Sequence, residues 1–314
     1  MTKYFANRSK RKNAAEIALF VAAILAAILF ILPTILTISN SFMSKTEINA
    51  NYGAMISNAQ QSGSMWGSGV QEESKQRIFI SKDLNLKLIP DMVSFKQYIT
   101  VLFMSPEYLL KFWNSVILTV PITVFQILLA AVTSYGFSRY KGKARAVIFF
   151  VYVILMLMPY QVTLVPNFMV SKWLNILETR WAIILPGIFS PFSIYLLTKT
   201  MRRIPTALYE AAKLDGCNEV QIFLHIVMPL TKNAMLSVGL LVFIDNWNMV
   251  EQPLILLKKQ EMYPLSVLLS QINSGDVELA FAVAVIYMVP ALLLFLYGEE
   301  YLLEGVSYSG GVKG

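Results

Sequence analysis

The stretch that decides the fold is IALFVAAILAAILFILPTILTI, residues Ile17–Ile38. It contains no charged residue, and an α-helix needs about 20 apolar residues in a row to cross a hydrocarbon core roughly 30 Å thick. Further apolar runs of similar length follow along the chain. They extend approximately over Phe112–Phe137, Ala146–Val165, Trp181–Thr198, Met235–Val250 and Leu279–Leu296.

The composition agrees with a chain that lies largely in lipid. Hydrophobic residues make up 56% of it and charged residues 14%, and its mean hydropathy is +0.57. Only helices and closed barrels satisfy all backbone hydrogen bonds inside a bilayer, and the runs are continuously apolar rather than alternating as barrel strands would be. The sequence therefore predicts an all-α integral membrane protein with six transmembrane helices.

Basic residues predict the orientation. They cluster in the N-terminal segment, between the second and third runs, and between the fourth and fifth runs. Such clusters beside transmembrane helices tend to remain in the cytoplasm, so we expect both termini there. The net charge of +7 arises from these flanking clusters. It is not one basic stripe with interleaved aromatic residues, and no nucleic-acid partner is expected.

Signatures of catalysis and metal binding are absent from the sequence. The segment from Gly136 to Lys143 resembles a phosphate-binding loop only loosely, because Ala144 stands where Ser or Thr is required. His225 and Cys217 are single residues of their kinds and do not make a zinc site. We therefore expect no catalytic residue and no metal site, and transport would need an external source of energy.

The most informative motif is Glu210-Ala211-Ala212-Lys213-Leu214-Asp215-Gly216, followed by Pro229-Leu230. Pro205 suits the start of a helix, and Gly216 permits a sharp turn after it. Beyond the turn, apolar residues recur at helical spacing and predict a face that packs on the membrane domain. The residues of this predicted face are Val220, Phe223, Leu224 and Val227.

This motif resembles the EAA loop of permease subunits of binding-protein-dependent ABC importers, in the branch that takes up carbohydrates. The resemblance covers nearly everything from Ser94 to Gly314. Further stretches that resemble the family are Phe112-Trp113-Asn114-Ser115, Ser134-Tyr135-Gly136-Phe137-Ser138-Arg139 and Trp247-Asn248 with Pro253-Leu254. At Met249 the family commonly has an acidic residue.

The resemblance implies a cytoplasmic coupling helix between helices 4 and 5. Its residues Glu210, Ala211, Ala212, Asp215 and Gly216 would couple to an ATPase. The implied partners are a second homologous permease subunit, two cytoplasmic ATPase subunits, an extracytoplasmic solute-binding protein and a carbohydrate solute. ATP and magnesium would be bound by the ATPase, with no cofactor in this chain. The implied location is the bacterial inner membrane, as a multi-pass protein surrounded by lipid.

The expected domain organisation follows from these assignments. It comprises a cytoplasmic segment (residues 1–15), a first transmembrane helix (16–38), an extracytoplasmic loop (39–111), a permease domain (112–300, with the coupling loop at 199–232) and a cytoplasmic tail (301–314). Within the extracytoplasmic loop, Asn51–Gly69 is rich in Ser, Gly, Asn and Gln. That composition fits a partly disordered loop and an external contact equally well.

The C-terminal residues Gly310, Gly311, Val312, Lys313 and Gly314 resemble the tail of the second, smaller membrane subunit of maltose importers. The resemblance implies that this tail reaches into the interface between the two ATPase subunits. The tail residues by themselves fit simple disorder equally well.

Polar residues in the membrane segments are candidates for a solute path. They are Asn114, Thr119 and Gln126 in the second segment, and Trp247 and Asn248 at the end of the fifth. Polar side chains at membrane depth face protein or water, so hydrogen bonds between helices explain them equally well. Asp245 is ionisable and lies at or close to the membrane, so we expect it to face the protein interior or the outer boundary layer of the membrane.

The predicted function is that of a permease subunit of an ATP-driven carbohydrate importer. The alternatives are an ion-gradient-driven secondary carrier and a membrane scaffold that does not transport. A carrier should show ionisable relay residues in mid-membrane, and a scaffold would need no coupling loop.

Overall fold

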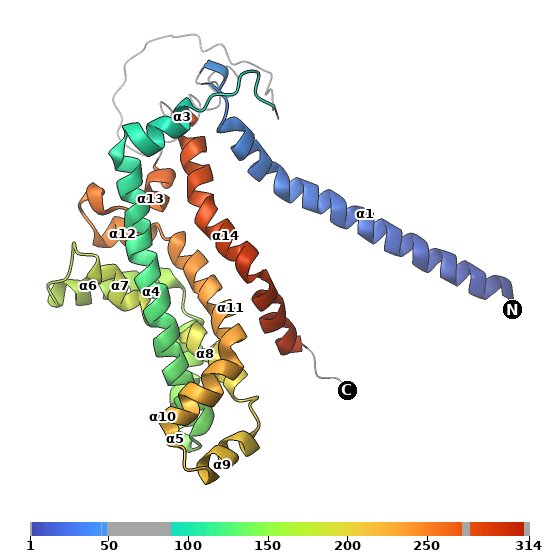
Figure 1. The fold of residues 1–314 in the computed structure, drawn as a ribbon, viewed down its shortest axis with the longest axis vertical. Helices are drawn as coiled ribbons and strands as arrows, with labels where there is room; N and C mark the ends of the chain where they lie inside the picture. Colours follow the sequence, from blue (N-terminus) through green and yellow to red (C-terminus); the bar gives the residue numbers. More distant parts are fainter. Residues whose placement is uncertain (1, 45, 49–88, 272–276, 311–314) are drawn as a thin grey trace. The chain divides into compact units, whose positions relative to one another are not determined.

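The computed structural model describes residues 2–44, 46–48, 89–271 and 277–310, and the described residues form helices without a strand (Figure 1). The chain divides into two compact units. The first contains residues 1–104 and 272–285, and the second contains residues 105–271 and 286–314. Two predicted features, Asn51–Gly69 and Gly311–Gly314, lie outside the described residues.

The first unit is built on α1 (Thr2–Asn40), which contains the apolar run Ile17–Ile38. Beyond it, α3 (Lys96–Ile99) and the π-helical turn η2 (Thr100–Met104) return to the end of α1. The Ser41 and Tyr98 hydroxyls lie 2.6 Å apart, and the Gln97 amide donates to the Met43 carbonyl. The Phe42 ring packs on Tyr98 with centroids 5.3 Å apart. These contacts fix the chain as it leaves the first apolar helix.

In the second unit, α4 (Pro106–Arg139), α8 (Pro191–Met201) and α11 (Met228–Trp247) pack against one another (Figure 1). Their shared core includes Ala130, Leu197 and Val238. Gly239 permits the close approach of α11 to α4, because a Cβ added there would lie 2.7 Å from Cδ1 of Ile127. Small residues at helix contacts are typical of membrane proteins, where close packing drives association.

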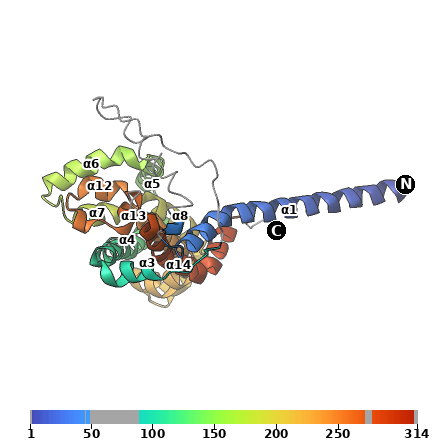
Figure 2. The ribbon, with the colours of Figure 1, turned by 90° about the horizontal axis from the view of Figure 1, so that it is seen from above.

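The predicted third membrane helix, Ala146–Val165, is not one straight helix. It is divided into α5 (Lys143–Met156) and α6 (Tyr160–Trp173), which meet at an angle of 104°. Pro159 precedes α6, and the residue before a proline is disfavoured in helical conformation, so the helix ends near Met156. Figure 2 shows α6 beside α7 (Trp181–Gly187) and α12 (Glu251–Leu256), which it contacts.

The other predicted membrane segments are confirmed. The described residues contain five helices long and apolar enough to cross a membrane, or six such segments if the bent pair is one span. The fourth segment joins α7 to α8. The fifth begins earlier than predicted, at Glu219, and the sixth lies in α14 (Val277–Gly310). Because α14 continues through Gly310, helix occupies most of the predicted tail 301–314.

Short elements complete the described chain. They are α9 (Thr206–Leu214), α10 (Glu219–Ile222), the π-helical turn η3 (Phe223–Val227), the 3-10 turn η4 (Gln260–Met262) and α13 (Leu265–Ser270).

Candidate functional site

The predicted coupling motif forms a short helix followed by a tight turn. Pro205 precedes α9, which ends at Leu214. Gly216 has a positive φ of +80°. The turn is closed by hydrogen bonds from the Gly216 amide to the Lys213 carbonyl (3.1 Å) and from the Cys217 amide to the Ala212 carbonyl (3.0 Å). A left-handed residue here is the usual way to end a helix, and glycine adopts it without steric cost.

A second helix starts directly after this turn. The Asn218 side chain accepts from the Gln221 amide, and the Gln221 side chain accepts from the Asn218 amide, each at 2.9 Å. This reciprocal cap satisfies backbone donors that the first turn of a helix leaves free. The helix then continues through η3 into α11. The motif and the fifth membrane segment are thus joined by nearly continuous helix.

The two faces of α9 differ sharply in exposure. Tyr209 and Ala212 are buried in the core shared with α4, α8 and α11. Glu210, Ala211 and Asp215 are exposed. The apolar Leu214 side chain is 89% exposed. An exposed apolar side chain at the end of a short helix is suited to contact with another protein.

A cavity of about 770 Å³ lies in the same unit. Gln126 of α4 reaches it, as do residues of α5, α6, α7, α8, α11 and α12. Its polar lining residues are Gln126, Tyr160, Thr163, Asn167, Ser190, Asp245, Asn246 and Gln252. Apolar and aromatic side chains, among them Phe189 and Phe192, form the rest. Sites for small molecules commonly combine a mainly apolar lining with a few polar groups in this way.

Asp245 gives the cavity its charge. Of the described residues that line it, Asp245 is the one with a charged side chain, and it is exposed. The Gln126 amide, by contrast, is buried and donates to the Ser193 hydroxyl at 2.8 Å. The cavity is therefore lined by neutral hydrogen-bonding groups and one carboxylate.

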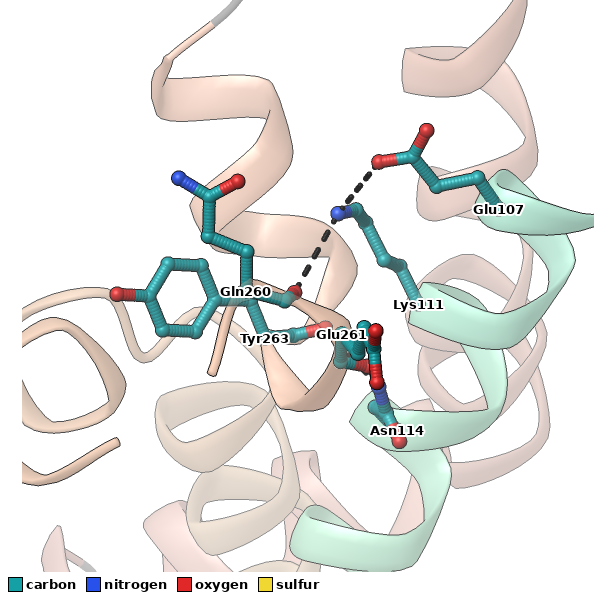
Figure 3. A network of polar contacts seen from close by, with 6 residues as sticks. All are labelled: Glu107, Lys111, Asn114, Gln260, Glu261 and Tyr263. Carbon is teal, nitrogen blue, oxygen red and sulfur yellow. Dashed lines mark hydrogen bonds and ion pairs between the residues drawn. The ribbon is translucent and has the colours of Figure 1, made fainter. Parts of the chain in front are cut away.

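In the N-terminal part of α4, a polar network joins this helix to residues 260–263 (Figure 3). The Asn114 amide donates to the Glu261 carbonyl at 2.6 Å and to the Tyr263 carbonyl at 3.3 Å. Its oxygen accepts from Arg180 at 2.8 Å. Lys111 lies 2.8 Å from Glu107 and donates to the Gln260 carbonyl at 3.5 Å. Asn114 thus joins three segments that are distant in sequence.

We expect Asn114→Ala to destabilise the protein by about 2–4 kcal/mol, because it leaves buried polar groups without partners. Thermal unfolding of the purified protein, followed by near-UV circular dichroism, measures the change. Asn248→Ala is the matched control, because Asn248 is an exposed amide near the end of α11. Equal losses in the two variants would contradict a special role for Asn114.

Comparison with known sequences decides the family. Residues 126–302, more than half of the chain, match the family described as binding-protein-dependent transport system inner membrane component. The chain belongs to this family. It is therefore a multi-pass inner membrane component of a binding-protein-dependent transport system.

Curated relatives of this inner membrane component are transport permeases. It is 32% identical over 235 residues to the arabinooligosaccharides transport system permease protein AraQ of Bacillus subtilis (strain 168), covering 74% of this chain and 83% of the relative. It is 30% identical to the lactose transport system permease protein LacG of Rhizobium radiobacter, covering 65% and 75% of the two chains.

The fold is also that of a solved transporter. A chain of a bacterial ABC transporter involved in the import of the acidic polysaccharide alginate superposes with a TM-score of 0.71 at 22% identity, covering 91% of this inner membrane component and 95% of that chain. A chain of a bacterial alginate ABC transporter in complex with an alginate pentasaccharide-bound periplasmic protein gives a TM-score of 0.58 at 14% identity, covering 91% of this inner membrane component and 94% of that chain.

The structure separates the predicted coupling residues into two groups. Glu210, Ala211, Asp215 and Gly216 lie on the exposed side of the loop. Ala212 instead packs inward, 5% exposed, so it belongs to the core of this family member. Leu214 was absent from the predicted set, although it stands inside the motif. An apolar residue between Lys213 and Asp215 was the signal for it.

The apolar face predicted after the turn is partly wrong. Val220 and Leu224 are exposed by 64% and 50%, whereas Ile222 and Val227 are fully buried. The π-helical turn at residues 223–227 adds a residue to the helical repeat, so a strict α-helical count assigns the wrong side chains to the buried face.

The predicted path residues have mostly structural contacts. Asn114 belongs to the network described above, and the buried Thr119 donates to the Asn246 carbonyl at 3.3 Å. Trp247 is buried and donates to the Tyr287 carbonyl at 3.1 Å, and Asn248 accepts from the Tyr287 hydroxyl at 2.7 Å. Only Gln126 of the five lines the cavity.

Several lining residues were not predicted. Asn167 and Gln252 stand outside the predicted runs, and Tyr160 follows a proline within one of them. The bend between α5 and α6 brings Tyr160 and Asn167 to the cavity. A straight helix over Ala146–Val165 would have hidden this arrangement.

Proposed function

We propose that this inner membrane component is the permease subunit of an ATP-driven importer of uncharged oligosaccharides. The observation that supports it most is α9, a short helix that buries one face in the hydrophobic core shared with α4, α8 and α11 and leaves the other face exposed. The motif that forms it resembles the coupling loop of ABC importer permeases, and curated relatives are permeases named for arabinooligosaccharide and lactose transport.

The exposed side of α9 is the proposed contact with a separate ATPase. Ala207, Ala211 and Leu214 recur at helical spacing on this side and are exposed. Glu210 and Asp215 flank the apolar residues with carboxylates. Such a surface combines an apolar anchor with a polar rim, as protein interfaces commonly do.

Basic residues support placing the α9 end in the cytoplasm. Arg139 ends α4, Lys143 begins α5 and Lys199 lies in the last turn of α8. Positive charge beside membrane helices favours the cytoplasmic side. In this orientation α9 faces the compartment that holds ATP, and both termini are cytoplasmic. The resemblance of Gly310–Gly314 to the tail of maltose importer subunits favours a contact of these residues with the ATPases.

The cavity is the proposed contribution of this chain to the solute path. Amides, hydroxyls and a carboxylate can pair with sugar hydroxyls, and aromatic rings such as Tyr160 and Phe192 can pack on the apolar faces of sugar rings. Asp245 would repel an anionic sugar, because no described lining residue supplies a compensating positive charge. An uncharged oligosaccharide fits this chemistry best.

The proposed cycle needs partners for each step. An extracytoplasmic binding protein delivers the oligosaccharide, and a second permease subunit completes the path. Two ATPase subunits close on ATP and move α9, while ATP hydrolysis occurs on those subunits. Binding protein and ATP must favour the same state of the transporter, so each raises the affinity of the complex for the other.

Reconstitution of the complete complex tests this proposal. We expect the chain to purify with a second permease and two ATPase copies, and we expect loaded binding protein to stimulate ATP hydrolysis. Leu214→Asp should weaken ATPase binding by about tenfold or more, since it places a charge in an apolar contact. Glu210→Ala should have a smaller effect in the same direction.

Leu174→Asp is the matched control for Leu214→Asp. Leu174 is a half-exposed leucine at the end of α6, away from α9 in the sequence. Equal ATPase binding by Leu214→Asp and the unmodified chain would contradict the proposed contact. Transport by the isolated chain without ATP would favour the secondary carrier instead.

A further inference from the structure

Side-chain contacts link the C-terminal end of α4 to the coupling loop. The Arg139 guanidinium lies over the Tyr209 ring of α9, 3.9 Å from its centroid. The Tyr135 hydroxyl donates to the Glu219 carboxylate at 2.5 Å. The other oxygen of Glu219 pairs with Lys213 of α9 at 2.8 Å. Two separate contacts therefore connect α4 to the loop.

Each link is of a kind that holds a defined geometry. A hydrogen bond to a carboxylate is stronger than one between neutral groups, and stacking of an arginine on an aromatic ring favours one orientation of the guanidinium. Burial raises the pKa of Tyr209, so its ring remains a neutral phenol beneath Arg139. The Tyr135 ring also packs on Phe223 of η3, with centroids 5.2 Å apart. Tyr135 thus contacts both Glu219 and Phe223 of the segment that follows α9.

The two membrane helices that meet at the loop also line the cavity. Gln126 of α4 and Asp245 of α11 both reach it. The continuous helix from Glu219 connects the loop to α11 by the backbone. The side chains of Arg139 and Tyr135 connect the same loop to α4. A displacement of α9 can thus reach two walls of the cavity by different routes.

We propose that Tyr135, Arg139, Lys213 and Glu219 form a clamp that transmits the movement of α9 to α4, so that α4 and α11 move together when the ATPases close. This inference rests on the proposed function, because it takes α9 as the ATPase contact. The four residues are positioning residues. They bind neither ATP nor solute, and they set how much of the ATPase movement reaches the cavity.

Tyr135→Phe tests the clamp with the smallest change, because it removes one hydroxyl and keeps the ring on Phe223. The complete complex is placed in liposomes with an uncharged arabinooligosaccharide and its binding protein, and uptake and ATP hydrolysis are measured together. We expect ATPase binding and basal hydrolysis to be unchanged. Oligosaccharide taken up per ATP should fall about threefold to tenfold.

Tyr140→Phe is the matched control. Tyr140 caps the same helix and is 64% exposed, and we expect its variant to keep the normal ratio of uptake to hydrolysis. The exchange of charges in Lys213→Glu with Glu219→Lys should recover part of the ratio lost in Lys213→Glu alone. This recovery distinguishes the ion pair from a general need for lysine at residue 213.

The outcomes separate the clamp from the proposed function. An unchanged ratio in Tyr135→Phe, or equal changes in Tyr135→Phe and Tyr140→Phe, would overturn the clamp. A parallel fall of uptake and hydrolysis would also overturn it, since a clamp alters their ratio. If the unmodified complex shows no solute-stimulated hydrolysis at all, the proposed function itself fails.

Discussion

Gly216→Ala is expected to lower oligosaccharide uptake about tenfold. Gly216 has a φ of +80°, and a residue with a Cβ pays about 1–2 kcal/mol in the left-handed region. No atom lies within 4 Å of the added methyl group, so the effect comes from the backbone alone. The cost favours other turn conformations, in which α9 no longer has its fixed direction. Uptake and stimulated ATP hydrolysis by the reconstituted complex measure the loss.

Gly136→Ala provides a closely matched control for this substitution. An added Cβ at Gly136 also meets no atom within 4 Å, but Gly136 lies inside α4 and has no positive φ. Alanine suits a helix better than glycine, so this variant should retain uptake. Gly216→Asn should recover most of the activity, because asparagine tolerates the left-handed region. Normal uptake by Gly216→Ala would contradict the need for this turn.

The membrane segments could be predicted because their signal is strong and local. A continuously apolar run such as Ile17–Ile38 is stable in lipid as a helix, and the structure has a helix there. The turn at Gly216 could be predicted equally well, since few residues other than glycine suit it. The bend at Pro159 could be predicted only in part. A proline shows where a helix is weakened, but the 104° angle depends on packing with elements distant in sequence.

The cavity was the hardest feature to predict. Its residues come from α4, α5, α6, α7, α8, α11 and α12, and no sequence pattern relates them. Polar residues in a membrane helix look alike whether they face a cavity or a neighbouring carbonyl. Thr119 donates to a backbone carbonyl, whereas Gln126, about two turns further along the same helix, lines the cavity. Only the fold distinguishes these two roles.

Asp245→Asn is expected to lower uptake of an uncharged oligosaccharide about tenfold and to reduce the selection against anionic ones. Hydrogen bonds to a charged group contribute about 1.5–3 kcal/mol, more than those to a neutral amide, so the loss of charge weakens contact with sugar hydroxyls. The same change removes repulsion of a uronate. Uptake of an arabinooligosaccharide and of an oligogalacturonide by the reconstituted complex, each supplied with a binding protein that holds it, measures both effects.

Asn246→Asp is an informative companion variant, because it adds a second carboxylate beside Asp245 in the cavity lining. We expect it to exclude the oligogalacturonide more strongly than the unmodified complex does. The ratio of the two uptake rates should thus rise in Asn246→Asp and fall in Asp245→Asn. A ratio that is the same in all three complexes would show that the charge of this cavity does not select the solute, and the selection would then lie in the binding protein or in the second permease subunit.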